Sequence, residues 1–388
     1  MSHGKITCQI CGSLEHSIQL HLRNSHPDVT LESYTEVYSD APLLSNLAKQ
    51  KLADGSLAKT KVAATEVKTP VKIPKLGAGK KYLHEAFGFS EKEAGVLSAT
   101  GSPIPITVLE SSEENKAYVP EVSDKYIYSV DELKNVILAL ELNIPCYVWG
   151  HKGSGKTELW EQVAARTNRP IIRVQHTVNT EESHIVGQWT VKDGATVFEM
   201  GPLPLAMKNG WVYMADEYDF ALPSVLSVYQ SVLEGKSLMI KEADAENRIT
   251  KPHPNFRFVA TGNTNGSGDE SGLYQGTNLQ NSANYDRFGV VIHKNYLKRD
   301  AESLILQGSV GLNVRDANKM VDFANKIRDA FNDKKISDTI SPRSLKYASM
   351  LGLKRASFTE GIKLAFTNKL STVDRETVTQ VMQRVFGE

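Results

Sequence analysis

Residues 150–157, which read GHKGSGKT, constrain the fold of this chain more than any other segment. They match the pattern G-x-x-x-x-G-K-[ST] in full, follow an apolar run at 144–150 and open a helical pattern at 156–166. Glycines let such a loop curl until its backbone N–H groups face phosphate oxygens, and the N-terminus of the following helix adds favourable partial charge. The sequence therefore predicts a phosphate-binding loop between a buried strand and a helix.

The residues of this loop have separate expected roles. Lys156 is predicted to reach the β and γ phosphates of a nucleotide, and the Thr157 hydroxyl to coordinate Mg²⁺. The rest of the predicted nucleotide-binding set is Gly150, His151, Lys152, Gly153, Ser154, Gly155 and Glu158. A glycine-rich turn that matches by chance is the alternative, and the agreement of strand, loop and helix disfavours it.

Two acidic residues follow the apolar segment WVYMAD, at 211–216. Asp216 and Glu217 stand at its carboxyl end, where ligands bind in open α/β sheets. Asp216 is predicted to hold Mg²⁺, directly or through water, and Glu217 to polarise the attacking water as a general base. The alternative is an acidic N-cap for the next helix, and Asp219 is interpreted as such a cap or as a surface residue.

Three further polar residues are candidates for the catalytic apparatus. Asn263 follows the apolar segment 256–261 and is predicted to orient the attacking water, with simple turn chemistry as the alternative. Arg287 precedes the last apolar segment and is predicted to face a neighbouring subunit's nucleotide as an arginine finger, unless it forms a surface Asp–Arg pair. Arg343 opens a helical pattern and is predicted to contact the γ-phosphate region, unless it is only a helix-start arginine.

Apolar runs alternate with helical patterns between 126 and 297, which predicts a parallel sheet covered on both faces. The expected strands are 144–150, 171–175, 211–216, 256–261 and 290–296. The expected helices are 156–166, 203–209 and 223–235, the last opening at a proline and closing at a glycine. Residues 298–388 show only helical patterns, so a separate helical lid is expected.

The N-terminal third differs in composition from this core. Residues 46–81 hold nine lysines against two acidic residues and no aromatic residue, so we expect a flexible basic linker. Residues 82–125 carry two short helical patterns, HEAFGF and SEKEAGVL, and are expected to form a small extension of the core. The predicted parts are thus 1–45, 46–81, 82–125, 126–297 and 298–388.

Cys8, Cys11, His21 and His26 lie in the first of these parts, with the spacing C-x2-C-x9-H-x4-H. Two thiolates and two imidazoles at this spacing can complete a tetrahedral Zn²⁺ site, in which flanking leucines of a helix cover the metal. His16 is a spare candidate ligand. The alternative is a reduced cysteine pair near unrelated histidines.

Bulk composition excludes several classes of protein. No run of about 18 apolar residues exists, and the N-terminus lacks the apolar region of a signal peptide, so no membrane span or export is expected. Three cysteines are too few for a disulfide scaffold, and Cys146 is interpreted as a small buried hydrophobe, which fits the reducing cytoplasm. Because 45 basic residues balance 45 acidic ones, bulk charge predicts no polyanionic partner.

The order of phosphate loop, acidic strand end, polar sensor, arginine finger and lid arginine resembles that of AAA+ ATPases. More narrowly, the chain resembles the MoxR-like branch, which includes CobS, the ATPase subunit of aerobic cobaltochelatase. The similarity covers roughly residues 82–300. It is carried by EAFGF, EQVAARTNRP, GPLPLAMKNG, DEYDFALPSV, FVATGNTNGSGDESGLYQGT and NYDRF.

This resemblance implies an ATP-hydrolysing, Mg²⁺-dependent motor that forms a hexameric ring, with Arg287 completing the site of the next subunit. It implies a protein partner with a metal-dependent adhesion-type domain, like CobT, and a role in conformational work rather than in chelation itself. It also implies β-hairpin insertions that engage the partner. Alternating apolar residues around Asp193 and Gly194 predict one hairpin at 186–200, and a second is expected at 237–250.

The N-terminal part resembles the zinc finger of the Ros/MucR regulators, through HLRNSHP and ESY. That family binds DNA, but residues 1–45 carry two basic against five acidic residues, which disfavours DNA and favours protein docking. Such a finger departs from the usual cobaltochelatase subunit and puts that role in doubt. A motor for an unrelated protein target and a nucleic-acid-binding protein with a regulatory ATPase therefore remain as alternative functions.

Overall fold

A computed structural model describes residues 5–26, 29–46, 48–49, 79–93, 95–110, 112–269 and 272–387. The chain divides into two compact units, Met1–Pro70 and Val71–Glu388. Most of the predicted basic linker lies outside the described residues. Strand β3 (Lys80–Tyr82) spans the boundary predicted at residue 81 and pairs antiparallel with β4 at Pro105–Thr107.

The N-terminal unit contains a two-stranded hairpin followed by two short helices. Its elements are β1 (Ile6–Thr7), β2 (Leu14–Glu15), α1 (Ile18–Ser25) and α2 (Leu31–Val37). Ser17 and Thr30 cap the two helices, each accepting a hydrogen bond from a backbone N–H of the first turn. Four buried residues, Cys8, Ile18, Leu22 and Tyr34, form the centre of this unit.

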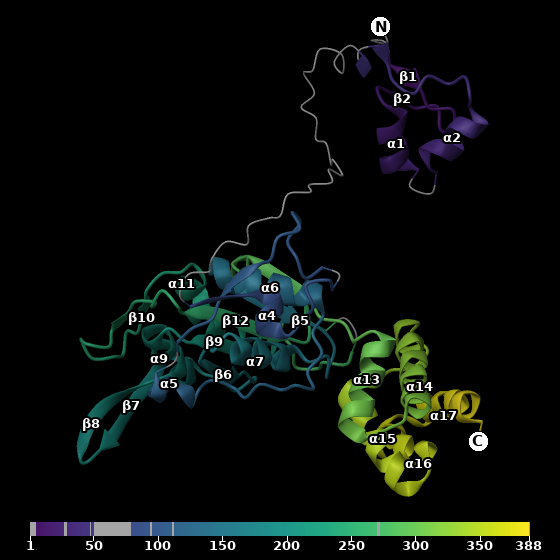
Figure 1. The fold of residues 1–388 in the computed structure, drawn as a ribbon. Helices are drawn as coiled ribbons and strands as arrows, with labels where there is room; N and C mark the ends of the chain where they lie inside the picture. The colour runs from purple at the N-terminus through teal and green to yellow at the C-terminus, as the bar shows by residue number, and fades with distance from the viewer. Residues whose placement is uncertain are drawn as a thin grey trace. The chain divides into compact units, whose positions relative to one another are not determined.

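The second unit is built on a parallel five-stranded sheet in the order β13-β5-β12-β9-β6, which confirms the predicted α/β fold (Figure 1). The strands are β5 (Cys146–Trp149), β6 (Ile171–Gln175), β9 (Val212–Asp216), β12 (Arg257–Gly262) and β13 (Val290–His293). Strand β13 is shorter than expected because its partner β5 ends at Trp149, opposite His293.

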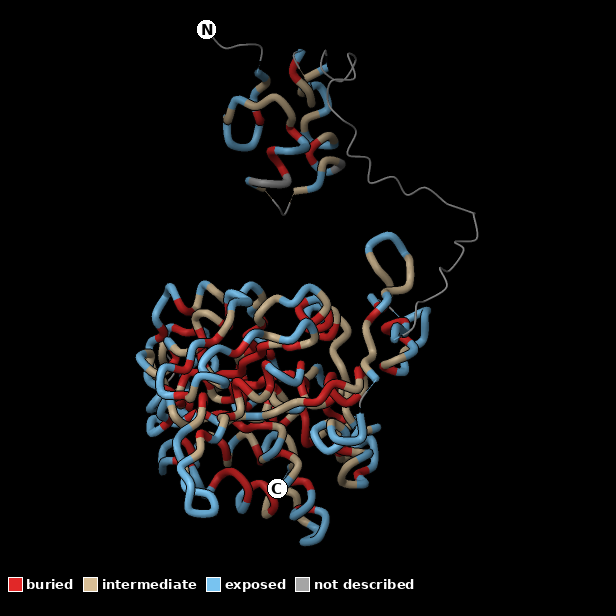
Figure 2. The backbone as a smooth tube through the Cα atoms, turned by 90° about the vertical axis from the view of Figure 1, so that its left-hand side faces the viewer, coloured by how far each residue is buried: buried red, intermediate tan, exposed pale blue. Residues whose placement is uncertain are grey.

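Separate apolar clusters cover the two faces of this sheet, as predicted. On one face, α6 (Val130–Leu142) and α7 (Lys156–Arg166) pack through Leu133, Trp160 and Val163. On the other, α8 (Glu182–Val186), α9 (Pro202–Asn209) and the segment after β9 pack against the tyrosines and phenylalanines of the strands. Figure 2 shows the buried residues running through the interior of this part.

The segment expected as one helix at 223–235 is divided into α10 (Pro223–Leu226), the 3₁₀ turn η2 (Ser227–Tyr229) and α11 (Gln230–Leu233). The Ser227 hydroxyl donates to the carbonyl of Ser224 at 2.6 Å, a local bond that competes with the helical ladder. The shorter elements nearby are η1 (Tyr218–Phe220) and α12 (Ser282–Tyr285).

Both predicted hairpins are present. The first pairs β7 (Gly187–Lys192) with β8 (Ala195–Met200), and its turn residues Asp193 and Gly194 have φ of 52° and 79°, as a type I′ turn requires. The second pairs β10 (Leu238–Met239) with β11 (Ile249–Thr250).

The predicted N-terminal extension is only partly helical. Its helices are α4 (Leu83–Phe87) and α5 (Glu113–Lys116). The pattern SEKEAGVL forms turns in its described residues instead of a helix, because Gly95 takes a left-handed conformation with φ of 84°.

The lid is wholly helical, as expected, and has its own apolar core around Phe323, Ile340 and Leu345. Its elements are α13 (Arg299–Val310), α14 (Val314–Asn332), α15 (Pro342–Arg355), α16 (Phe358–Ala365), η3 (Thr367–Lys369) and α17 (Thr372–Phe386). Within the described ranges, no helix is long and apolar enough to cross a membrane.

Candidate functional site

A cleft of about 690 Å³ opens at the carboxyl ends of the central strands. The phosphate-binding lysine and five of the predicted catalytic and magnesium-binding residues line it together: Lys156, Thr157, Asp216, Glu217, Asn263 and Arg343. Its other walls are Lys152, Gly153, Gly155, Glu158, Glu161, Arg173, Gln175, Leu273 and Tyr274. Residues far apart in the sequence therefore converge on one site, which no single motif could establish.

The loop between β5 and α7 depends on two glycines in particular. A Cβ atom at Gly150 would lie 2.2 Å from the carbonyl oxygen of Lys294, so a larger residue would displace the loop from β13. Gly155 has φ of 83° and forms the N-cap of α7, which leaves the first backbone N–H groups of that helix facing the cleft. The loop thus has the open backbone that phosphate binding requires.

Lys156 is nearly buried at the start of α7. Its Nζ donates to the carbonyl oxygen of Gly150 at 2.7 Å and to Oδ1 of Asn263 at 3.0 Å. Burial is the main cause that lowers the pKa of this amine, to about 8, while the acidic residues of the cleft act in the opposite direction. The predicted sensor Asn263 and the loop lysine are therefore in direct contact.

Asp216 is 2% exposed, and its carboxylate accepts hydrogen bonds at both oxygens. Its Oδ1 accepts from the hydroxyls of Thr157, at 3.0 Å, and Thr261. Its Oδ2 accepts from Nε of Arg173 at 2.7 Å, with the Nη2 of the same side chain at 2.5 Å. The two residues predicted to bind Mg²⁺ are thus adjacent.

Glu217 leaves the end of β9 in a left-handed conformation, with φ of 52°. Its Oε2 accepts from Nε2 of Gln175 at 2.9 Å, and its backbone N–H donates to the Thr261 hydroxyl at 3.3 Å. Such a conformation is uncommon for a residue with a side chain and often marks a functional site.

Asp219 is interpreted from the sequence as a cap or a surface residue. The surface interpretation is wrong, because Asp219 is completely buried. Its Oδ2 accepts from the backbone N–H groups of Asn263 and Thr264, both at 2.8 Å, and from the Thr264 hydroxyl at 2.9 Å. Burial raises the pKa of this carboxyl group. Asp219 therefore fixes the loop that presents Asn263 to the cleft.

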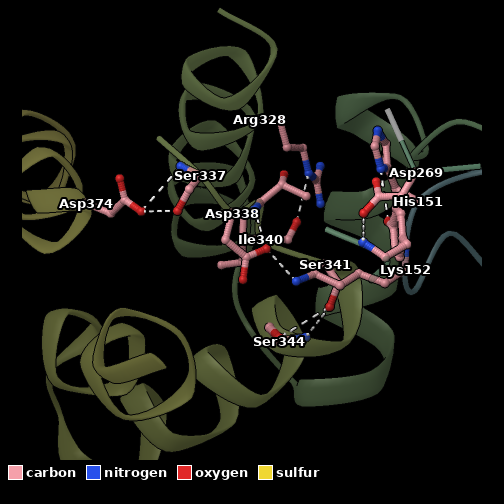
Figure 3. Close-up of polar contacts among 12 residues, drawn as sticks. His151, Lys152, Asp269, Arg328, Ser337, Asp338, Ile340, Ser341, Ser344 and Asp374 are labelled. Atoms are coloured by element: carbon pink, nitrogen blue, oxygen red, sulfur yellow. Dashed lines mark hydrogen bonds and ion pairs between the residues drawn. The ribbon is translucent and has the colours of Figure 1, made fainter. Parts of the chain in front are cut away.

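The lid contacts the phosphate loop directly (Figure 3). Lys152 Nζ donates to Oδ1 of Asp338 at 2.5 Å, and a Cβ at Gly153 would lie 2.9 Å from Cβ of Ser341. Ser341 also caps α15 by accepting from the N–H of Ser344 at 3.1 Å. These contacts bring the first turn of α15, and with it Arg343, to the cleft.

A buried arginine supports this part of the lid. Arg328 makes a two-point ion pair with Glu302, at 2.6 and 2.7 Å, and its Nε donates to the carbonyl of Ile340 at 3.2 Å. Its guanidinium also lies 4.2 Å from the ring centroid of Tyr296, which precedes the lid. The segment that ends at Ser341 is therefore fixed from both sides.

Four residues predicted for the nucleotide site do not line the cleft: Gly150, His151, Ser154 and Arg287. His151 lines a separate cavity of about 180 Å³ with Trp149 and Tyr274, and its Nδ1 is 3.0 Å from the Tyr274 hydroxyl. Arg287 forms an ion pair with Glu234, with Nε and Nη2 at 2.8 and 2.7 Å from Oε1. His151 therefore touches the cleft only through its wall residue Tyr274 and through Lys156, whose Nζ donates to the His151 carbonyl oxygen at 3.3 Å, and Arg287 is absent from the cleft lining in the ranges described.

The predicted zinc ligands converge in the N-terminal unit. The ligand atoms of Cys8, Cys11, His21 and His26 all lie within 4.8 Å of one another. Nε2 of His26 is buried with no hydrogen-bond partner among the described residues, and Nδ1 of His21 lies 3.4 Å from Oε1 of Glu15. This donor set and the carboxylate behind one imidazole fit a divalent metal.

Two details of that cluster differ from expectation. His16, the additional candidate zinc ligand, instead forms a hydrogen bond between its Nδ1 and the Ser45 hydroxyl, at 2.8 Å. Leu20 is 64% exposed, so only Leu22, of the two leucines flanking His21, is buried. Hydrogen bonding with the Ser13 side chain is the largest cause that lowers the pKa of the Cys11 thiol, to about 5, which favours the thiolate that metals bind.

Both the core and the lid of this chain are similar in sequence to known proteins. Residues 146–288 match the AAA domain of the dynein-related subfamily, and residues 302–388 match the CbbQ/NirQ/NorQ C-terminal family. The aerobic cobaltochelatase subunit CobS of a Sinorhizobium species is 35% identical over 286 residues, which is 70% of this chain and 84% of that protein. The chain belongs to the CbbQ/NirQ/NorQ (MoxR-like) family of AAA+ ATPases.

Other similarities are more distant. An uncharacterized protein of Staphylococcus haemolyticus is 30% identical over 185 residues, covering 46% of this chain and 66% of that one. A mutant of Thermotoga maritima RuvB is 15% identical with a TM-score of 0.44, covering 69% of this chain and 81% of that one.

The motifs of this AAA+ chain did not reveal every residue in contact with the acidic pair. Arg173 and Gln175 reach Asp216 and Glu217 from the neighbouring strand β6. Arg173 and Gln175 are two residues apart in IIRVQ, so they lie on the same face of the strand. This spacing was the sequence signal that could have marked them as a pair. Only the pairing of β6 with β9 shows which carboxylates they reach.

Proposed function

We propose that this AAA+ chain is the ATP-hydrolysing subunit of a ring-shaped motor that remodels a partner protein. One observation carries the proposal. Lys156, Thr157, Asp216, Glu217 and Asn263 line a single cleft, although they come from three different strand ends. Membership in an AAA+ family and the similarity to CobS support the same reaction, ATP plus water to ADP plus phosphate.

The contacts in the cleft suggest which residue serves each step of ATP binding and hydrolysis. Mg²⁺ held by Thr157 and Asp216, whose oxygens are 3.0 Å apart, would neutralise charge on the phosphates. Lys156 binds phosphate oxygens, and Glu217 accepts the proton of the attacking water. Asn263, positioned by Asp219, orients that water, and Arg343 of the lid contacts the γ-phosphate region.

Nucleotide binding tests this proposal most directly. Titration calorimetry with Mg·ATP should give a defined Kd for the full chain, and Lys156→Ala should raise it at least about 10-fold, because a charge-assisted contact to phosphate is lost. Lys363→Ala, which removes an exposed lysine on α16, is the matched control and should leave the Kd unchanged. Absence of Mg²⁺-dependent binding by the unaltered chain would overturn the proposed function.

We further propose a hexamer in which Arg287 acts on the site of the next subunit. Arg287 contacts Glu234 and stays outside its own cleft, as a residue acting between subunits would. The β7–β8 and β10–β11 hairpins expose apolar side chains, with Trp189 at 47%, Val191 at 71% and Met239 at 61%. These surfaces suit contact with a protein partner.

The similarity to CobS makes a CobT-like adhesion-domain protein the leading candidate partner, and a cobaltochelatase-like complex the leading context. The N-terminal unit instead favours a motor that acts on an unrelated protein target. In that case the zinc-binding unit would dock onto the target protein, and both would be cytoplasmic. Nucleic-acid binding by that unit is the third candidate. Salt-dependent binding of DNA by the full chain would favour it, whereas stimulation of the ATPase by an adhesion-domain protein would favour the first two.

The Cys8, Cys11, His21 and His26 cluster is proposed to hold one Zn²⁺. Elemental analysis of the purified full chain should find about one zinc per chain, the number that a single four-ligand site takes. Changing Cys8 and Cys11 together to Ser should remove it. The matched control, Cys146→Ala, alters the buried cysteine of β5 and should retain the metal. Equal zinc content in the two variants would contradict the assignment.

A further inference from the structure

Arg173 occupies one oxygen of the carboxylate that the proposed mechanism assigns to magnesium. Its Nε and Nη2 lie 2.7 and 2.5 Å from Oδ2 of Asp216, while Thr157 and Thr261 donate to Oδ1. The carboxylate therefore has strong donors on both oxygens, and one of them carries a full positive charge.

The two partners differ in their freedom to move. The Asp216 side chain is 3% exposed and ends strand β9, whereas the Arg173 side chain is 46% exposed on strand β6, at the edge of the sheet. The guanidinium can thus leave the carboxylate and turn toward the open cleft. Asp216 cannot follow it without leaving its two threonine donors.

A divalent cation and a guanidinium repel each other when they bind the same carboxylate group, even at different oxygens. Arg173 also competes in geometry, because two nitrogens of its planar fork contact Oδ2, so a metal cannot use that oxygen freely while the ion pair persists. The cleft offers an alternative site for the displaced guanidinium, since the same walls are proposed to bind phosphate oxygens.

On the basis of the proposed nucleotide site, we propose that Arg173 competes with Mg²⁺ for Asp216 and so sets how strongly metal and nucleotide binding are coupled. Arg173 weakens binding of the metal until nucleotide phosphates are present to receive the guanidinium. The role is that of a residue controlling cofactor affinity, distinct from the metal ligands themselves.

The coupling can be measured without turnover. It is the ratio of the Kd for ADP in EDTA to the Kd for ADP at saturating Mg²⁺, both from calorimetry on the full chain. Arg173→Gln should lower this ratio roughly 5- to 10-fold, within the usual range for coupled sites, because the free chain would then bind Mg²⁺ without competition. If Arg173 also contacts the ADP phosphates, its replacement weakens ADP binding both with and without Mg²⁺. This direct loss changes both Kd values by a similar factor and largely cancels in their ratio.

Two further variants separate competition from general electrostatics. Arg173→Lys keeps the charge but loses the fork, so competition predicts an intermediate fall in the ratio, whereas a purely long-range effect predicts the unaltered ratio. Arg299→Gln removes a similarly exposed arginine that pairs with Asp322 on the lid, and it should leave the ratio unchanged.

An unchanged or higher ratio in Arg173→Gln, with ADP binding intact, would overturn the inference and leave the proposed function standing. Failure of the unaltered chain to bind ADP with Mg²⁺ would remove both. Thermal unfolding of each variant checks that the fold persists. If Arg173→Gln fails to fold, the Arg173→Lys result decides the question alone, because an unaltered ratio there excludes competition by the fork.

Discussion

Replacing Glu217 by Gln is expected to lower ATP turnover by about 10²- to 10⁴-fold, the usual contribution of a general base, while Mg·ATP still binds. The amide is nearly the same size as the carboxylate, and its oxygen can still accept the hydrogen bond from Gln175. It cannot take a proton from the attacking water. Steady-state phosphate release and calorimetry on the same preparation would measure the two effects separately.

Glu360→Gln is a suitable control for this experiment, because Glu360 is exposed on α16 and pairs only with Lys363 among the described residues. Its turnover should match that of the unaltered chain. If Glu217→Gln retained turnover within about 2-fold, Glu217 would be no general base, given the effect expected of one. A slow variant that still binds ATP should also hold its partner longer, so co-purification with it offers a route to the remodelled protein.

Local sequence signals predicted the fold of the core well. Gly150, Gly155 and Lys156 specify strand, loop and helix within a few residues, and the structure places them there. The turn at Asp193 and Gly194 likewise needs positive φ at both positions, which its residue types favour. In each case the signal and the structure it predicts involve neighbours in the chain.

Contacts between distant segments could not be predicted in this way. Asp219 resembles any acidic residue near a helix start, and only the approach of β12 to the end of β9 buries it under Asn263. Arg173 is an ordinary polar residue of a strand until the sheet order places it beside Asp216. These residues act through tertiary neighbours, and their own sequence surroundings give no indication of those neighbours.

Arg287→Ala is expected to reduce ATP turnover by about 10³-fold or more, the effect typical of losing an arginine finger, with little change in Mg·ATP affinity. The guanidinium lies outside its own cleft, so in the proposed role it would stabilise transition-state charge only where two subunits meet. Size-exclusion chromatography with light scattering should show that the variant still assembles. Arg355→Ala, at the exposed end of α15, is the control.

Mixing two inactive variants tests whether Arg287 acts between subunits. Arg287→Ala subunits retain Glu217, and Glu217→Gln subunits retain Arg287, so a mixed ring contains interfaces at which both residues are present. In an equal random mixture about a quarter of the interfaces are complete, because each contact in a cyclic ring joins two different surfaces. Turnover should therefore recover toward that fraction after the subunits are exchanged. An arginine that acted within its own chain would give no recovery at any mixing ratio, since every subunit would still lack one of the two groups.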